Sequence, residues 1–447
     1  MAWRQSLLTI AISLIVSCAS SRDLAGPKDL AAPVRTASNA PSVWKTLVEQ
    51  LTAPAVANAF PGEDDGSSAA TTNFLVHAAL RSWKSIEPPP GAHPMVCDLA
   101  WFDDSIWVSF GNKTISTDGA RIYSWNPRRG WKLEFNWDRG GAAGVTHERG
   151  GQGISRLRVL GDALYATDAD APNFGGFGIS DAPLEGYVFV ADREGFGPLR
   201  DGDLPPAQTL IVPLAFHVFD ITKYQGHLVA SGGTLAPPGA RSRYPGGLFV
   251  QGESGELWPR FFPGIDTKSG VVRATFMHRF RGRLYVGFQN NEKRMQWDLG
   301  VVDGDPSLAA TELVLGRVTK RGGWKTRHFA SDAESLYWIA GDTRRRGLSS
   351  LFRSNDGRSF SEVALGAKIG EPHDVLAAAG SALVLADAGL FRLGADGASS
   401  EVLAAPPGKP FARRDGFCSA AMTATPLGLF AGSTNGLGIY FAEPDPK

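Results

Sequence analysis

The chain has 447 residues, with 45 basic and 45 acidic side chains and only 3 cysteines. Because the charges balance, there is no basic footprint for nucleic acid, and we expect no nucleic-acid partner. The 53 glycines and 29 prolines exceed average usage and favour a fold rich in turns. No apolar run approaches the roughly 20 residues of a membrane-spanning helix, apart from a shorter one at the N-terminus.

Residues 1–17 are predicted to form a secretory signal. Arg4 is the only charge there, an apolar stretch runs from Leu7 to Val16, and small residues follow. The apolar stretch is too short to span a bilayer as a mature helix. We therefore expect an exported protein.

The signal ends in the stretch Leu14-Ile15-Val16-Ser17-Cys18, which resembles the lipobox of bacterial lipoproteins. The resemblance implies that Cys18 becomes the lipidated first residue, carrying palmitate or similar chains. It also implies a membrane anchor on the periplasmic or cell-surface side, with the outer membrane favoured. Ordinary cleavage after Ser17 or Ala19, with an incidental cysteine, is the alternative.

Residues 18–72 follow as an Ala-, Pro- and Ser-rich segment with one amphipathic patch at 43–51. This composition is typical of a tether, here carrying one short helix. We expect the tether to hold a folded domain, residues 73–447, away from the lipid.

A strand pattern recurs from Val96 onward: a semi-polar run, a tight turn, then a run of the type Leu-Tyr-Val. The seven copies are spaced about 54 residues apart on average, as in propeller repeats. Their equivalent positions are Ile106, Leu164, Leu228, Leu284, Leu336, Leu383 and Leu429. Each copy is followed by a second strand-like run, and usually by a third.

Four short strands per repeat, rich in β-branched and aromatic residues, are typical of propeller blades. The sequence predicts an all-β fold, a seven-bladed β-propeller of four-stranded blades, with six or eight blades as alternatives. The seventh repeat ends one strand short at Phe441-Ala442. The stretch Leu80 to Ile86 resembles an outer strand, so we expect the last blade to be closed by this N-terminal strand, which removes open sheet edges.

Cys97 and Cys418 are each expected at the start of the innermost strand, in the first and last blades respectively, and these two blades are neighbours in a closed ring. In an oxidising compartment, a disulfide between them would lock the ring. Two buried thiols out of register are the alternative.

One turn between third and fourth strands, Ser354-Asn355-Asp356-Gly357-Arg358-Ser359-Phe360, resembles the Asp-box of sialidase-like (BNR) propellers. Two looser copies, around Ser124 and Gln251, keep only part of the pattern. In that family the box is a structural turn, so the resemblance implies the fold and not the activity. The arginine cluster and tyrosine nucleophile of sialidases are not found, and no catalytic residue is assigned.

Counting back eight places from the equivalent positions gives one residue per inner strand, namely Asp98, Arg156, Asp220, Phe276, His328, Val375 and Ala421. His217 and His373 fall two or three places earlier in the pattern, nearer one mouth of the channel. Converging charges of both signs can orient a polar ligand. Asp98, Arg156, His217, Asp220, His328 and His373 are therefore the candidate ligand-binding residues, and simple ion pairing in a wet channel is the alternative.

Long connections between second and third strands, and between blades, are expected on one face, which we call the long-loop face. Binding usually lies in loops held by a rigid scaffold. One such loop begins with Asp168 and Asp170, which can ligate Ca²⁺ or merely cap the loop. No other cofactor is predicted.

Three functions remain open. The first is a monomeric, membrane-anchored propeller that binds a protein, glycan or other polymer through its long-loop face. The second is a glycan hydrolase or lyase at the channel mouth, with Glu148, Asp168, Asp170 and Asp220 as acids and His217, His328 and His373 as bases. The third is a metal-dependent hydrolase that uses His217, His328 and Asp220.

Overall fold

The structure is a computed structural model, and it describes the part of the chain that forms the blades, with gaps. The described residues are 69–90, 95–111, 121–136, 153–168, 185–197, 208–234, 246–253, 255–260, 271–290, 298–316, 318, 325–341, 349–408, 410–411, 418, 420–433 and 438–445. Cys18, the tether up to residue 68 and most of the long connections lie outside this description. Among the described residues no helix is long and apolar enough to cross a membrane.

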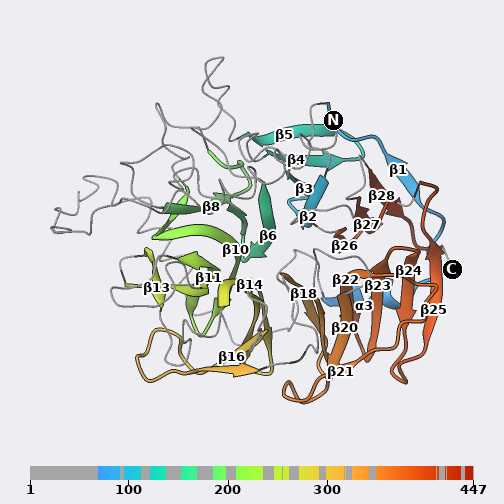
Figure 1. The fold of residues 1–447 in the computed structure, drawn as a ribbon. Helices are drawn as coiled ribbons and strands as arrows, with labels where there is room; N and C mark the ends of the chain where they lie inside the picture. Colours follow the sequence, from blue (N-terminus) through green and yellow to red (C-terminus); the bar gives the residue numbers. More distant parts are fainter. Residues whose placement is uncertain are drawn as a thin grey trace, which may run out of the picture.

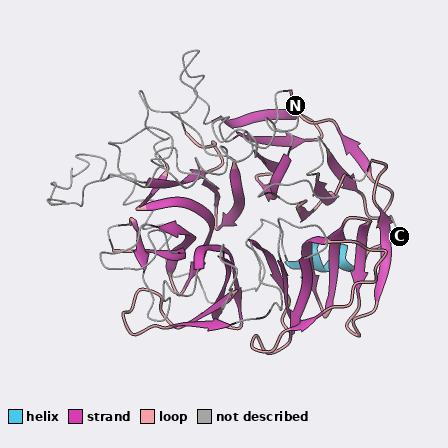
Figure 2. Cartoon of the chain, viewed as in Figure 1, coloured by secondary structure: helices cyan, strands magenta, loops and turns pink. Residues whose placement is uncertain are grey.

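The described residues form seven four-stranded antiparallel sheets, which confirms the predicted seven-bladed propeller. Figure 1 shows the sheets arranged around a common centre, and Figure 2 shows that strands make up nearly all of the fold. The first strand of each blade, here called the inner strand, lies nearest the centre (Figure 1). All seven equivalent positions of the repeat lie in second strands.

The first three blades are built from strands in chain order, inner strand first. Blade 1 holds β2 (Met95–Phe102), β3 (Ser105–Gly111), β4 (Arg121–Asn126) and β5 (Gly130–Asn136). Blade 2 holds β6 (Ile154–Leu160), β7 (Ala163–Asp168), β8 (Glu185–Ala191) and β9 (Leu210–Pro213). Blade 3 holds β10 (Ala215–Tyr224), β11 (His227–Thr234), β12 (Gly246–Gln251) and β13 (Leu257–Arg260).

The remaining blades follow the same order, except for the last strand of blade 7. Blade 4 holds β14 (Val271–Phe280), β15 (Arg283–Asn290), β16 (Leu299–Asp303) and β17 (Leu313–Gly316). Blade 5 holds β18 (Lys325–Ser331), β19 (Leu336–Gly341), β20 (Ser349–Ser354) and β21 (Ser361–Glu362). Blade 6 holds β22 (Pro372–Ala378), β23 (Ser381–Ala386), β24 (Gly389–Leu393) and β25 (Ser399–Ala404). Blade 7 holds β26 (Met422–Thr425), β27 (Gly428–Gly432), β28 (Ile439–Ala442) and β1 (Lys84–Ile86).

Strand β1 closes blade 7, as the sequence predicted. It pairs antiparallel with β28, with Lys84 opposite Phe441 and Ile86 opposite Ile439. The Lys84 ammonium lies 2.8 Å from the Glu443 carboxylate and reinforces the join at the surface. The two ends of the described chain therefore meet in one sheet.

The turns between first and second strands are tight, and they define a short-turn face opposite the long-loop face. In blade 3 the turn residues Gln225 and Gly226 have φ of +49° and +85°, and in blade 6 Ala379 and Gly380 have +47° and +76°. Two successive positive φ values are the mark of a type I′ hairpin, whose twist matches the flanking strands.

Helix α3 (Ala69–His77) packs on the short-turn side of blades 6 and 7. Leu75 and Val76 are buried in the core that these two blades share, against residues such as Leu376 and Met422. Arg392 of β24 donates hydrogen bonds of 2.7 and 2.6 Å to the carbonyls of Val76 and Ala78, which satisfies the helix end. The expected boundary between residues 72 and 73 falls inside this helix.

Cys97 in β2 and Cys418, just before β26, are joined by a disulfide in the structure, with their Cα atoms 4.5 Å apart. The bond links the inner parts of blades 1 and 7. It lies on the same junction of the ring that β1 closes.

The turn at 354–360 joins β20 to β21 and is held by Asp356. The Asp356 Oδ1 atom accepts amide hydrogen bonds from Arg358 and Ser359, both at 2.7 Å, and a hydroxyl hydrogen bond from Ser354 at 2.9 Å. These bonds hold the pKa of the exposed Asp356 carboxyl well below its usual range, with the Ser359 and Arg358 amides as the main causes. The turn is structural and lies away from the channel.

Candidate functional site

The centre of the propeller holds a buried ionic network built from inner strands β2, β6 and β10. Arg158 donates from Nε and Nη2 to the two carboxylate oxygens of Asp220, both at 2.9 Å. Arg156 donates to Asp98 at 3.2 Å, and its Nε lies 4.0 Å from Asp220. The structure thus brings together three of the six candidate residues, Asp98, Arg156 and Asp220, and adds Arg158.

Three inner-strand aspartates, in blades 1, 3 and 6, also connect their own blade to the next one through the backbone. The amides of Leu157, Met277 and Met422 donate to the carboxylates of Asp98, Asp220 and Asp374 at 2.8, 2.8 and 2.7 Å. Each aspartate sits at an irregularity in its strand, where the pairing register shifts by one residue. Such a bulge re-aims a side chain. These carboxylates therefore tie neighbouring inner strands together.

The alignment of blade 6 was wrong by one residue. In the structure Ala382, rather than Leu383, takes the position in blade 6 that corresponds to the equivalent positions of the other blades. The reason is that β22 and β23 join through the turn Ala379-Gly380. The counted inner-strand residue is therefore Asp374 and not Val375. Every residue from Ala382 to Ala386 is buried, so hydrophobicity does not distinguish the two faces of this strand.

The two candidate histidines that the structure describes lie toward the long-loop ends of their strands, apart from this network. His217 is buried in β10, and Arg273 donates to its Nε2 at 2.6 Å. Because a guanidinium only donates, this nitrogen of His217 accepts. His373 is buried at the start of β22, with Nε2 2.7 Å from a carboxylate oxygen of Asp387.

The remaining candidates are described in part. His328 lies on β18, and its side chain is outside the described part of the structure. Asp168 is fully buried at the end of β7, while Glu148 and Asp170 are outside the described residues. Among the described residues, no three His, Cys, Asp or Glu side chains gather in a way that would hold a metal ion.

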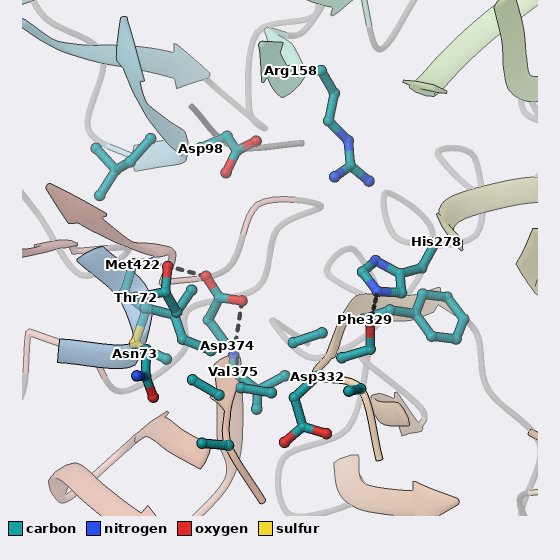
Figure 3. Close-up of a pocket in the computed structure, with 18 of the residues that line it drawn as sticks. Thr72, Asn73, Asp98, Arg158, His278, Phe329, Asp332, Asp374, Val375 and Met422 are labelled. Atoms are coloured by element: carbon teal, nitrogen blue, oxygen red, sulfur yellow. Dashed lines mark hydrogen bonds between the residues drawn. The ribbon is translucent and has the colours of Figure 1, made fainter. Parts of the chain in front are cut away.

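A cavity of about 390 Å³ occupies the channel at the short-turn face. Inner strands of blades 1, 2, 4, 5, 6 and 7 and the helix α3 line it. Figure 3 shows polar side chains surrounding an open space. The polar lining includes Asn73, Asp98, Arg158, His278, Asp332 and Asp374.

One wall of this cavity rests on a stack of three rings. His278 stacks on Phe329 with an interplanar angle of 12°, and Phe329 stacks on the buried Trp338 with an angle of 4°. The His278 Nε2 atom lies 2.8 Å from the Ser331 hydroxyl. The Ser331 hydroxyl therefore holds the edge of the imidazole, and the Phe329 ring covers one of its faces.

The rim of the cavity is formed by a turn of blade 5 and by α3. Asp332 accepts amide hydrogen bonds from Glu334 and Ser335 within its own turn, at 2.8 and 2.7 Å. Its other oxygen accepts the amide of Gly380 in blade 6 at 2.7 Å. The neighbouring Ala333 is exposed, as is Asn73 on the helix.

Sequence reasoning missed Arg158, His278, Asp332 and the helix residues of this cavity. Arg158 and His278 each come two places after a counted residue, Arg156 and Phe276, and so lie on the same strand face. That period of two was the available signal. Nothing in the sequence indicated that α3 would reach the channel.

No protein-family model matches the chain, and no curated protein matches it. Solved structures do match. The WD40 beta propeller domain of Doa1 is 12% identical, with 81% of this chain and 97% of that chain covered and a TM-score of 0.42. The beta-propeller domain of the Trilobed protease from Pyrococcus furiosus is 10% identical, with 78% and 95% covered and a TM-score of 0.41. The gluconolactonase XC5397 from Xanthomonas campestris is 11% identical, with 86% and 96% covered and a TM-score of 0.39. At these values the similarity concerns the propeller fold alone.

Proposed function

We propose that the protein is an exported, lipid-anchored propeller that binds a protein, glycan or other polymer through its long-loop face without transforming it. The observation that carries this proposal is the use of the central aspartates. Asp98, Asp220 and Asp374 each accept an amide from the next blade. A catalytic acid or base must instead reach a substrate proton.

The connectivity supports the choice of face. Segments 112–120, 169–184 and 235–245 join second to third strands, and 137–152 joins blade 1 to blade 2. All four begin and end on the long-loop face. A closed, disulfide-linked ring is the kind of rigid scaffold on which binding loops are found. We propose that the protein acts there as a monomer.

The binding proposal is tested by sedimentation with insoluble bacterial polysaccharides, including peptidoglycan. We expect the full chain to sediment, and a variant with residues 235–245 replaced by a Gly-Asn turn to remain soluble. Replacement of 198–207, which joins β8 to β9 on the short-turn face, is the matched control and should leave sedimentation unchanged. Release of soluble sugar during incubation would instead favour the hydrolase or lyase alternative.

The anchor is tested separately, because it rests on the sequence resemblance. Phase partition in a cloud-point detergent should place the full chain in the detergent phase and a Cys18→Ser variant in the aqueous phase. Mass spectrometry of the N-terminal peptide should find acyl chains on Cys18. An unmodified peptide that begins at Ala19 or Ser20 would point to ordinary signal cleavage.

A further inference from the structure

We propose that residues 43–51 of the tether form a short helix that docks on the outer face of α3, against Phe74. The outer face is the side of α3 that carries Asn73, Phe74 and His77, all of which are exposed. Docking makes part of the tether a layer of the folded surface on the short-turn side. The contact lies within one chain and away from the long loops, so it is independent of the polymer-binding proposal.

Phe74 is an apolar side chain at the surface, although the two residues after it are buried. Leu75 and Val76 are 1% and 0% exposed, whereas Phe74 is 51% exposed. Leu427, in the short turn between β26 and β27, is 37% exposed on the same side of blade 7 as the helix. The other large apolar side chains that are exposed among the described residues lie on blades 1 to 4. Exposed apolar side chains are therefore found where the tether enters the fold.

The tether carries an apolar stripe that such a surface can cover. Trp44, Leu47, Val48 and Leu51 follow the spacing i, i+3, i+4 and i+7 of one helix face. A helix of this length is marginal on its own in water, because isolated helices need about 12–15 residues. The segment therefore needs an apolar surface to pack against if it is to form a helix.

The connection between the two segments has a suitable length. Residues 52–68 separate the stripe from Ala69, the first residue of α3. A flexible linker of that length spans about 20–25 Å on average, whereas α3 is about 13 Å long. Such a linker gives the segment an effective concentration in the millimolar range at α3. A second copy of the chain would have to compete from solution at its bulk concentration.

Charge also favours the tether over a membrane surface as the occupant. The segment has one basic and one acidic side chain, Lys45 and Glu49, so its net charge is zero. The helix α3 contains no Lys, Arg, Asp or Glu, so no like charge on it opposes the segment. A bilayer rich in anionic lipid is attracted by Lys and Arg, and α3 offers neither.

Docking sets the distance between the propeller and the membrane, and this consequence rests on the proposed anchor. The free part of the tether shrinks from residues 18–68 to residues 18–42. Its mean span falls from about 40 Å to about 28 Å. Because α3 lies on the short-turn side, this side is then held nearer to the lipid than the long-loop face.

The test is photo-crosslinking of the full chain, with benzoylphenylalanine in place of Phe74. It is carried out in the wild-type background and in Cys18→Ser, which cannot be lipidated at that position. Digestion after glutamate separates residue 74 from the stripe, because Glu49 and Glu63 lie between them. Mass spectrometry then identifies the linked peptides, and a mixture of two isotope-labelled preparations distinguishes links within a chain from links between copies.

The matched controls differ in one feature each. Trp258 on β13 is an aromatic side chain of similar exposure, 48%, and benzoylphenylalanine in its place is the control for position. Leu47→Asp puts a charge into the stripe, and Thr46→Asp puts the same charge on the opposite side of the segment. Both of these changes lie in the tether, outside the blades.

We expect position 74 to link to residues 43–51 in both backgrounds, and position 258 not to do so. Leu47→Asp should lower the yield of this link by about fivefold or more, because it removes a buried leucine from the contact. Thr46→Asp should leave the yield unchanged. The proposal is overturned if position 74 gives no link, or if it links only to other parts of the chain, to another copy or to lipid.

Trypsin provides a second measurement that needs no unnatural side chain. Lys45 lies within the docked segment, while Arg35 lies outside it. We expect Phe74→Ser to speed cleavage after Lys45 by about fivefold or more, and to leave cleavage after Arg35 unchanged. Equal rates at Lys45 in the wild type and in Phe74→Ser would contradict the docking. Failure of the anchor alone appears in phase partition and changes neither the crosslinks nor these rates.

Discussion

The Met422 amide donates a 2.7 Å hydrogen bond to the Asp374 carboxylate, which joins the inner strand of blade 7 to that of blade 6. The same carboxylate accepts the amide of Val375 at 2.9 Å, and its residue is only 4% exposed. One side chain therefore satisfies backbone groups on two blades.

Removing this carboxylate should destabilise the propeller strongly. Asp374→Ala leaves two buried amides without their acceptor, and each such group costs about 1–3 kcal/mol. We expect a loss of that order or greater in the free energy of unfolding, measured by urea denaturation. Asp396→Ala is the control, because Asp396 accepts the Ala398 amide in an exposed turn. Equal losses in the two variants would contradict the role assigned to Asp374.

The bridge between Cys97 and Cys418 should form in the oxidised protein and stabilise it. The two cysteines are 321 residues apart in sequence, so the bond constrains most of the unfolded chain. In the loop-entropy description the stabilisation grows with loop length, and removing a native disulfide typically costs about 2–5 kcal/mol. We expect a reductant to lower the melting temperature of the wild type. The melting temperature of the double variant Cys97→Ser, Cys418→Ser should not change when the reductant is added. Free thiols in the native, unreduced protein would exclude the bridge.

Gly357→Ala should destabilise the turn between β20 and β21 for two reasons that can be separated. Gly357 has φ of +71°, and a Cβ atom there would collide with the Tyr285 hydroxyl. Gly282 has a similar φ of +76° but open space around it, while Gly366 has open space without a positive φ. We expect the largest loss in melting temperature for Gly357→Ala, a smaller one for Gly282→Ala, and none for Gly366→Ala. Any other order would contradict the collision with Tyr285.

The stability of the protein should fall at alkaline pH, partly because of Tyr165. Burial raises the pKa of Tyr165 from 10.0 to about 12. A folded-state pKa above the unfolded value gives stability that is complete below about pH 10 and is lost as the pH rises toward 12. The free energy of unfolding, measured by urea denaturation across this window, should decline less steeply with pH for Tyr165→Phe than for the wild type. The difference in slope should be up to about 1.4 kcal/mol per pH unit. Parallel declines would show that Tyr165 does not contribute.

Tyr165→Phe should also be tolerated at neutral pH. The Tyr165 hydroxyl is buried without a hydrogen-bond partner among the described residues, so its removal leaves no group unsatisfied. We expect a melting temperature at pH 7 equal to or above that of the wild type. Tyr224→Phe is the contrasting variant, because the single proton of the Tyr224 hydroxyl is donated between the carbonyls of Gly282 and Val302, at 3.0 and 3.1 Å.

The fold could be predicted because its signal repeats. Second strands such as those around Leu164, Leu228 and Leu284 share one apolar pattern after a tight turn, and seven copies reinforce one another. The closing strand could be predicted by counting the strands of each repeat, because the seventh repeat lacked its outer strand. The order of strands within a blade then follows from short antiparallel connections.

The cavity could not be predicted in the same way, because its residues depend on single-residue register and on contacts between blades. A slip of one place in blade 6 exchanged Asp374 for Val375, since buried residues on both faces of β23 hide the register. The Asp-Ala-Glu-Ser turn at Asp332 has a recognisable local pattern. Its bond to Gly380 joins segments 48 residues apart, and no local pattern indicates it.

Closure by β1 gives the ring a seam. Blades 1 to 6 are each made of consecutive strands, so each can form as soon as its own residues are available. Blade 7 must wait, because its outer strand comes from the beginning of the chain and the other three from the end. The disulfide and the Lys84–Glu443 pair both connect N-terminal residues of the propeller to its last blade. The ring is therefore completed only when residues from the two ends of the described chain come together, and a covalent bond and a surface ion pair hold those residues in place.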